Sequence, residues 1–128
     1  MHKTIIPIRF ADMDKLGHVN NANYLTYMET ARVSYFKDVV GAGVNWAEKG
    51  IILAKAEVNF FKPINLEHEE VHVLTHCSQL GTKSFELTQS ILIPDGKEVA
   101  TGSTTLVCFD YVKSQSIPIP TEWKTKFK

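Results

Sequence analysis

The hydrophobic period of this chain changes once, near residue 51, and this change constrains the fold more than any other feature. Between Ala22 and Val40 apolar residues recur at helical spacing, whereas from Ile51 onward they alternate with polar residues as in β-strands. The first stretch therefore predicts one long helix that Gly41 closes, followed by a shorter helical turn over Asn45–Lys49.

The expected helix carries more apolar residues than one stripe requires. Its apolar set is Tyr24, Leu25, Tyr27, Met28, Ala31, Val33, Tyr35, Phe36, Val39 and Val40. A helix at the surface of a globular protein buries a single stripe and leaves the rest in solvent. We therefore expect other elements to cover this helix on most of its sides.

Five segments have the composition and alternation of strands. They are residues 3–10, 52–61, 70–77, 83–93 and 98–112. We expect the last four to be antiparallel and joined by short hairpins, one of them at PDGK (94–97), where Asp-Gly tolerates positive φ. Pro7 suggests an edge or a bulge in the first strand. The pattern predicts an α+β fold, an antiparallel five-stranded sheet wrapped around one long central helix.

Length and charge limit the classes of protein to which the chain can belong. Its 128 residues predict a single domain over residues 1–128. Lys plus Arg equals Asp plus Glu at 14 each, without a basic cluster, so we expect no nucleic-acid partner. No apolar run is long enough for a membrane span or a signal peptide. Cys77 and Cys108 lie in predicted strands and are expected to be reduced thiols of a cytoplasmic protein.

Polar residues crowd the entry to the predicted helix, in FADMDKLGHVNNANYL (10–25). The DxDxxG pattern invites a calcium loop, but Leu16 and Asn23 stand where that loop needs oxygen ligands. His68, His72 and His76 suggest a metal cluster, yet strand residues four apart are separated by about 13 Å. We therefore expect no metal site and no organic cofactor.

A site built on the helix entry agrees best with these residue types. The first N–H groups of a helix have no partner within it, and they can bind an anion or polarise a carbonyl oxygen. Asn20, Asn21 and Asn23 favour helix initiation, and Gly17 permits a tight turn before it. Asp14 in the approach loop would then act as nucleophile or general base. The structural alternative is that Asp14 and the asparagines serve only as turn and cap residues, with His18 packed on the sheet.

The stretch RFADMDKLGHVNNANYLTYMETAR (9–32) strongly resembles the signature of hotdog-fold acyl-CoA thioesterases of the 4-hydroxybenzoyl-CoA thioesterase type. Its HVNNANYL segment is similar to long-chain acyl-CoA thioesterases and to plant acyl-carrier-protein thioesterases. The expected order of elements, a strand, a helix and four strands, is also the hotdog order. The resemblance covers essentially the whole chain, with its specific motifs in residues 9–32.

The resemblance implies roles for residues of the helix entry. It assigns the catalytic carboxylate to Asp14 and a structural role to Asp12, and it places the N–H that polarises the thioester carbonyl near Asn21. His18 matches a histidine of the plant enzymes, but Leu16 replaces their nearby Asn. His18 is therefore expected either to take part in catalysis or to position the loop or the substrate. Glu29, in the family's E-x-A-R motif, is either a working carboxylate or the ion-pair partner of Arg32.

The resemblance also implies how substrate and subunits would bind. Lys83, in the turn GTKS (81–84), is the first candidate for a CoA phosphate, ahead of Lys62 and Lys113. The acyl pocket would lie between the helix and the sheet of a neighbouring subunit, in a homodimer that joins two sheets edge to edge and often pairs again into a tetramer. Its candidate residues are Tyr24, Tyr27, Met28, Phe60 and Phe61, with Gly17 in the loop beside the substrate.

The function implied is hydrolysis of an acyl-CoA to a free acid and CoA. An acyl-carrier-protein thioesterase is the nearest alternative. A hydratase or dehydratase of acyl thioesters would keep the fold but change the chemistry. A non-catalytic module that binds acyl thioesters is the alternative from a different class.

Overall fold

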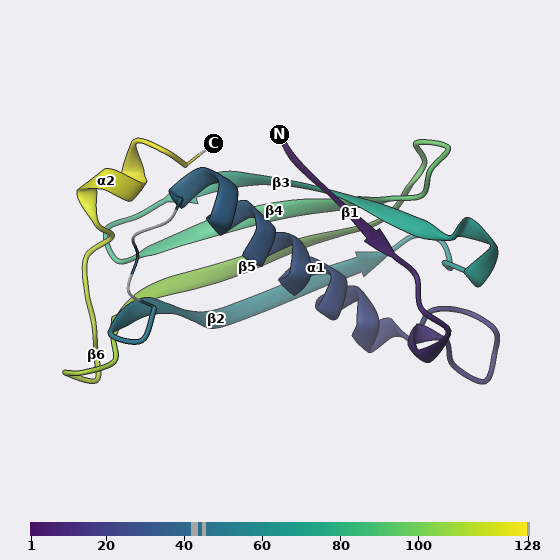
Figure 1. Cartoon of the computed structure of the whole chain (residues 1–128), viewed down its shortest axis with the longest axis horizontal. Helices are drawn as coiled ribbons and strands as arrows, with labels where there is room; N and C mark the ends of the chain where they lie inside the picture. The colour runs from purple at the N-terminus through teal and green to yellow at the C-terminus, as the bar shows by residue number, and fades with distance from the viewer. Residues whose placement is uncertain (42–43, 45, 128) are drawn as a thin grey trace.

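The computed structural model describes residues 1–41, 44 and 46–127 of the chain. One long helix lies across one face of a curled antiparallel sheet (Figure 1). The elements are β1 (His2–Pro7), η1 (Phe10–Asp12), α1 (Asn21–Tyr35), the π-helical turn η2 (Phe36–Val40), β2 (Lys49–Phe60), η3 (Leu66–His68), β3 (Glu70–Leu80), β4 (Ser84–Leu92), β5 (Glu98–Asp110), β6 (Gln115–Ser116) and α2 (Thr121–Lys124). The predicted α+β hotdog architecture is confirmed.

The strand order within the described residues is β1-β3-β4-β5-β2, and every neighbouring pair is antiparallel. Val73 of β3 pairs with Thr4 of β1 and with Ile91 of β4, which in turn pairs with Ala100 of β5. Val73, Ile91 and Ala100 are all buried. Because strand residues alternate between faces, this register directs one face of each central strand toward α1.

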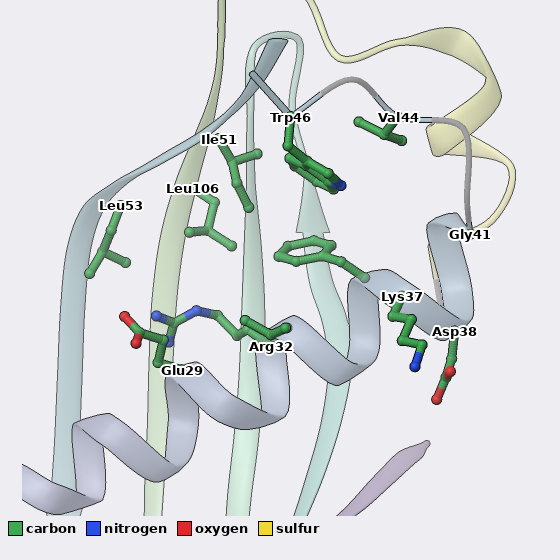
Figure 2. Close-up of a pocket in the computed structure, with 12 residues that line it drawn as sticks. Glu29, Arg32, Lys37, Asp38, Gly41, Val44, Trp46, Ile51, Leu53 and Leu106 are labelled. Atoms are coloured by element: carbon green, nitrogen blue, oxygen red, sulfur yellow. The ribbon is translucent and has the colours of Figure 1, made fainter. Parts of the chain in front are cut away.

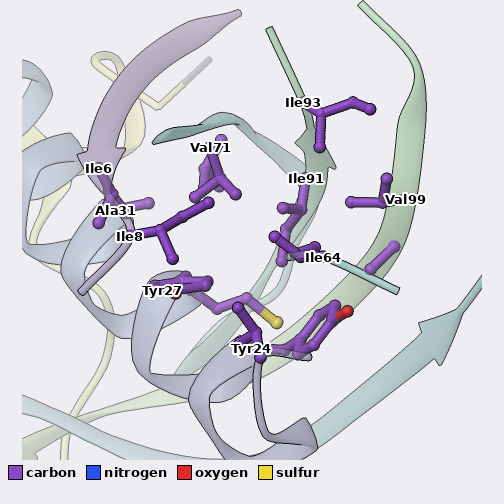
Figure 3. Close-up of a cluster of buried hydrophobic side chains, with 14 residues drawn as sticks. Ile6, Ile8, Tyr24, Tyr27, Ala31, Ile64, Val71, Ile91, Ile93 and Val99 are labelled. Carbon is purple, nitrogen blue, oxygen red and sulfur yellow. The ribbon is translucent and has the colours of Figure 1, made fainter. Parts of the chain in front are cut away.

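The inner face of α1 completes the core. Tyr24, Tyr27, Met28 and Ala31 pack with apolar residues of β1, β3, β4 and β5 in the larger of two buried clusters (Figure 3). Beneath the middle of the helix, the side-chain amide of Gln89 donates to the carbonyl of Met28, at 3.0 Å, and to the Thr75 hydroxyl, at 3.1 Å. These hydrogen bonds join the helix to the sheet where Met28, Thr75 and Gln89 are all fully buried.

Two predicted turns have the expected geometry. Gly41, which ends the helical segment, has φ +88°, and Gly96 in the Asp-Gly hairpin has φ +93°. The Asp95 carboxylate accepts a hydrogen bond from the Lys97 amide at 2.8 Å in the same hairpin. Left-handed φ values favour glycine because it has no Cβ to clash with the backbone.

The helix is less covered than its composition predicted. Leu25 is 42% exposed and Val33 is 64% exposed, because the sheet of one chain covers only the inner side of α1. The prediction of coverage on most sides is therefore wrong for a single chain.

The connection between β2 and β3 is also not the predicted hairpin. β2 occupies one edge of the sheet and β3 pairs with β1 near the other, so residues 61–69 cross from one side of the sheet to the other. Alternation of apolar residues reveals strands but carries no information about which strands pair. Three short hairpins were expected, and only β3–β4 and β4–β5 are of that kind.

Three element boundaries differ from the predictions. The first strand ends at Pro7, and the Asp12 side chain bonds back to the Arg9 amide at 3.0 Å to stabilise a 3₁₀ turn instead. Residues 46–48 form a turn, not a helix, while the predicted start at Asn45 lies outside the described residues. A sixth strand, β6, pairs with Phe109 and Asp110 because β5 extends beyond the end of β4.

Within the described part of the chain, no helix is long and apolar enough to cross a membrane. Cys77 and Cys108 are free thiols, as predicted, and Cys108 is buried. Burial raises the pKa of the Cys108 thiol to about 11, so it is an un-ionised core residue at neutral pH.

Candidate active site at the start of the central helix

The approach loop before α1 closes on itself. Met13 and Val19 form an isolated antiparallel bridge, and between them the Asp14 amide donates to the His18 carbonyl at 2.9 Å. Gly17 has φ +82° and donates its amide to the carbonyl of Asp14 at 3.1 Å. The tight turn expected at Gly17 is therefore present, and it presents residues 14–18 as one compact unit.

The helix begins at Asn21, as the asparagine cluster indicated. The Asn20 side chain caps it by accepting a hydrogen bond from the Ala22 amide at 2.9 Å, and the Asn23 amide donates to the Asn20 carbonyl at 2.8 Å. Among the described residues, none accepts a hydrogen bond from the Asn21 amide. That N–H, at the positive end of the helix, is available to a ligand oxygen.

Asp12 fastens the loop to the helix. This residue is only 1% exposed, and its carboxylate accepts hydrogen bonds from the Arg9 side chain, the Arg9 amide and the Tyr27 hydroxyl, the last at 2.8 Å. Its carbonyl accepts from the Asn20 amide at 2.9 Å and from the Asn23 side chain at 3.0 Å. The structural role expected for Asp12 agrees with these contacts, which hold the loop against the first turns of α1.

The Asp12 contacts have an electrostatic signature. Burial by itself raises the pKa of the Asp12 carboxyl, but the hydrogen bonds from Arg9 and Tyr27 together outweigh it, so the pKa lies below its ordinary value. Burial and the bond to Asp12 raise the pKa of Tyr27, which keeps its hydroxyl protonated as a donor. The Asp12 carboxylate and the Tyr27 phenol therefore stabilise each other's protonation state.

Stability is expected to fall in acid because of Asp12. A folded-state pKa below the unfolded one contributes stability that is fully present above the ordinary carboxyl pKa and is lost as pH falls through the folded value. Urea unfolding between about pH 7 and pH 3 measures this loss, since Asp carboxyls titrate near pH 4 when unperturbed. The Asp12→Asn variant should show a flatter acid limb than the wild type. Equal acid losses in both would assign the effect to other carboxyls.

Asp14 is half-buried and accepts one hydrogen bond, from the Leu16 amide to Oδ1, at 2.9 Å. Its second oxygen, Oδ2, has no partner among the residues that the structure describes. The loop thus holds a carboxylate near the helix start with one oxygen unoccupied. Over the same residues there is no group of three His, Cys, Asp or Glu side chains arranged to bind a metal.

The other predicted residues of this end of the molecule divide into exposed and buried ones. His18 and Gly17 are exposed in the loop, whereas Tyr24 and Met28 are buried in the core. Phe60 is 47% exposed and contacts the Tyr24 ring edge-on, with centroids 4.9 Å apart. Phe60 and Tyr24 therefore lie together at the helix start, while Met28 packs inward over Gly102.

Lys83 lies elsewhere. It is exposed in the β3–β4 hairpin, where its carbonyl accepts from the Cys108 amide at 2.9 Å, beside the segment that leads to α2. This hairpin and the Asp14 loop are at opposite ends of the sheet (Figure 1). Within one chain the structure does not bring Lys83 and Asp14 together. Lys62, the poorer candidate from the sequence, lies at the helix start instead, with its carbonyl 3.4 Å from the Tyr24 hydroxyl.

Sequence reasoning missed two features of this half of the molecule. Tyr27 was expected in the acyl pocket, yet its hydroxyl binds Asp12; nothing in a separation of fifteen residues signals that contact. A groove of about 880 Å³ lies between α1 and β2, and Glu29 and Arg32 line it (Figure 2). The spacing of Glu29 and Arg32 could have placed them on one side of the helix, but only the packing of β2 creates a cavity there.

Known proteins resemble this chain over most of its length. The family model described as Thioesterase-like superfamily matches residues 8–127. The long-chain acyl-CoA thioesterase FadM of Escherichia coli is 27% identical over 130 residues, which cover 98% of this chain and 96% of that protein. The 1,4-dihydroxy-2-naphthoyl-CoA hydrolase of Thermosynechococcus vestitus is 29% identical over 119 residues, 88% of this chain and 79% of that protein.

Solved structures are similar over nearly the whole chain. A thioesterase from Thermus thermophilus, whose crystal structure is complexed with coenzyme A and Zn, has a TM-score of 0.84 at 30% identity. The similarity covers 98% of this chain and 90% of that one. The putative thioesterase PA2801 of Pseudomonas aeruginosa has a TM-score of 0.85 at 29% identity, covering 97% and 95%.

Proposed function

Because the chain belongs to the thioesterase-like superfamily, we propose that it hydrolyses an acyl-CoA to a free acid and CoA at the start of α1. The observation that carries this proposal is the set of hydrogen bonds made by Asp12, which hold the loop of Asp14 against the start of α1. The Asn21 amide at this helix start has no acceptor among the described residues. A carboxylate beside a positive helix end is suited to attack on a polarised carbonyl.

In the proposed mechanism the thioester oxygen accepts a hydrogen bond from the Asn21 amide. As the carbonyl carbon becomes tetrahedral, negative charge gathers on this oxygen, and the helix end stabilises it more than it stabilises the ground state. His18 holds the loop through its carbonyl, which accepts from the Asp14 amide, and its exposed ring is available to position the substrate.

Asp14 supports two routes from that point. As a nucleophile it forms an acyl anhydride on its own carboxylate and expels the CoA thiolate; water then hydrolyses the anhydride. As a general base it takes a proton from water, which attacks the carbonyl, and the thiolate leaves as the tetrahedral intermediate collapses. The free Oδ2 atom is available for either route.

Glu29 is less suited to this carbonyl within one chain. It lies eight residues after Asn21, which is about 12 Å along the helix axis. A working carboxylate has to reach the reacting atoms within hydrogen-bonding distance, directly or through one water. We therefore propose Asp14 as the catalytic carboxylate, whereas Glu29 is a lining residue of the groove between α1 and β2.

A homodimer, or a tetramer made of two dimers, is part of the proposal. β2 is an edge strand of the sheet, and its Ile52, Leu53 and Phe60 side chains are exposed. A long apolar edge strand pairs readily with another strand unless something covers it. A second subunit would also allow Lys83 to serve the site of its neighbour as a CoA phosphate ligand. The free thiols Cys77 and Cys108 support the proposed cytoplasmic location.

The direct test is thiol release by the wild-type protein from short, long and aromatic acyl-CoAs, with an acyl-carrier-protein thioester in parallel. We expect turnover of at least one acyl-CoA, unaffected by a chelator because the helix amide and Asp14 supply the proposed catalytic groups. Binding of these esters without thiol release would contradict the proposal and favour the non-catalytic binding module. Turnover of the carrier-protein thioester alone would move the substrate to that class.

A further inference from the structure

A groove runs along the side of α1 that faces β2. Its larger part has a volume of about 880 Å³, and an adjoining pocket of about 180 Å³ shares Glu29, Arg32 and Leu53 with it. Most of the other lining side chains are apolar, among them Val33, Phe36, Trp46, Ile51 and Leu106 (Figure 2). The groove is therefore shaped for an alkyl chain along most of its length.

The groove starts close to the proposed reacting centre. The smaller pocket is lined by Leu25 and Thr26, which lie four and five residues after Asn21. That separation is about 6 Å along a helix, little more than one turn. An acyl group whose carbonyl binds at the Asn21 amide can therefore pass into the groove beside Leu25.

Arg32 lies in this groove without a close partner. It is only 8% exposed, and no hydrogen bond or ion pair joins its guanidinium to any described residue. Burial lowers the pKa of Arg32, although the Glu29 charge opposes this shift. A guanidinium carries five N–H donors in a fixed planar arrangement, so an anion that enters the groove meets donors that no described residue occupies.

The charges around Arg32 leave room for an added anion. Glu29, on the same helix, attracts it at longer range than an ion pair, since no contact within 4.0 Å joins them among the described residues. Asp38 is engaged by His2 at 2.7 Å, and Lys37 adds a second positive charge. From the sheet, β2 and β5 contribute Ile51, Leu53 and Leu106, which carry no charge.

We propose that Arg32 binds a carboxylate at the far end of the acyl group, so that the preferred substrates are CoA thioesters of dicarboxylic acids. This inference rests on the proposed thioesterase function. The planar guanidinium matches a carboxylate with two parallel hydrogen bonds, and the apolar walls accommodate the methylene chain between the two ends. The CoA phosphates fit less well, because they carry more charge and the groove offers few further donors.

The test compares dicarboxylic acyl-CoAs with monocarboxylic ones of equal length. Adipoyl-, suberoyl- and sebacoyl-CoA are paired with hexanoyl-, octanoyl- and decanoyl-CoA, and kcat/KM is measured for each member of a pair. A site built to bind a polar group discriminates strongly against the analogue that lacks it. We expect the wild type to prefer at least one dicarboxylic ester, and Arg32→Met to lower that preference by roughly ten- to hundredfold, the value of a hydrogen bond to a charged group. Arg32→Lys should keep part of the preference.

Two controls isolate the effect of Arg32. Lys3→Met removes the positive charge of an exposed side chain on β1, outside the groove, and should leave the preference for dicarboxylic esters intact. Binding of each ester and of free CoA is measured by equilibrium dialysis, so the inference is tested even if no ester is hydrolysed, which would contradict the proposed function alone. If Arg32→Met does not fold, Arg32→Lys replaces it, because this variant keeps the positive charge but lacks the planar guanidinium and should lose part of the preference for dicarboxylic esters.

Three results would overturn the inference. The first is a wild type that binds and turns over both members of every pair equally. The second is loss of affinity for free CoA in Arg32→Met, which would assign the guanidinium to a CoA phosphate. The third is dissociation of an oligomer by Arg32→Met in sedimentation experiments with equal loss on both ester classes, which would assign Arg32 to a contact with a second copy.

Discussion

Asp14→Asn is expected to reduce kcat/KM for thiol release by about two to four orders of magnitude, the range for removal of a positioned acid or base. Asparagine has nearly the same shape but no negative charge, so it can neither attack the thioester nor accept a proton from water. Its side-chain oxygen can still accept the hydrogen bond from the Leu16 amide that the Asp14 carboxylate accepts at 2.9 Å. The loop should therefore keep its conformation while the chemistry is lost.

A matched control exists elsewhere in the chain. Asp95 also accepts a hydrogen bond from the amide two residues later, Lys97, in an exposed turn. Asp95→Asn makes the same chemical change in the exposed turn between β4 and β5, outside the proposed catalytic residues, and it should leave both thiol release and thermal unfolding close to wild type. Activity within tenfold of wild type in Asp14→Asn would reject Asp14 as the catalytic carboxylate. If Glu29→Gln instead abolished thiol release, Glu29 in the groove would be the catalytic carboxylate.

The largest effect on stability is expected at Asp12. Asp12→Ala should reduce the free energy of unfolding by about 1–3 kcal/mol, the usual cost of leaving a buried hydrogen-bonding group, here the Tyr27 hydroxyl, without its partner, while the Arg9 side chain is 66% exposed and can bind water instead. The change removes the acceptor of the Tyr27 hydroxyl and of the Arg9 side chain and amide, while Tyr27 stays buried. Thiol release should fall as well, because the loop that carries Asp14 loses its attachment to α1.

Urea unfolding monitored by circular dichroism measures this loss. Asp38→Ala is the matched control, because Asp38 also forms an ion pair, with His2, but its side chain is 58% exposed. An exposed pair contributes roughly 0–1 kcal/mol, so this control should unfold nearly as the wild type does. A similar small loss in Asp12→Ala would mean that the backbone contacts of residue 12, from Asn20 and Asn23, suffice to hold the loop.

Local chemistry predicted the elements of this fold because local chemistry largely produces them. The asparagines at 20–23 favour helix initiation, and α1 begins at Asn21 with Asn20 as its cap. Asp95-Gly96 favours a turn with positive φ, and the β4–β5 hairpin has it. The loop of Asp14 and Gly17 was likewise visible, since a tight turn before a capped helix needs only residues close in sequence.

Pairing and burial depended on contacts between distant residues. The crossover from β2 to β3 could not be derived from alternation, because a strand pattern is the same whichever neighbour it has. The prediction that other elements cover α1 failed at Leu25 and Val33, because the apolar character of a side chain does not identify the element that packs against it.

The sequence by itself determined one central helix, a run of strands, and an Asp-Gly-His-Asn loop at the helix start, because capping, turn conformation and hydrophobic period act over a few residues. The tertiary structure decided that Asp12 binds Tyr27, that Lys83 lies away from Asp14, and that Arg32 faces a groove formed by β2. Those outcomes depend on which strand packs beside which side of the helix. That packing is set by the burial of the whole sheet, and no short segment of the sequence contains enough information to predict it.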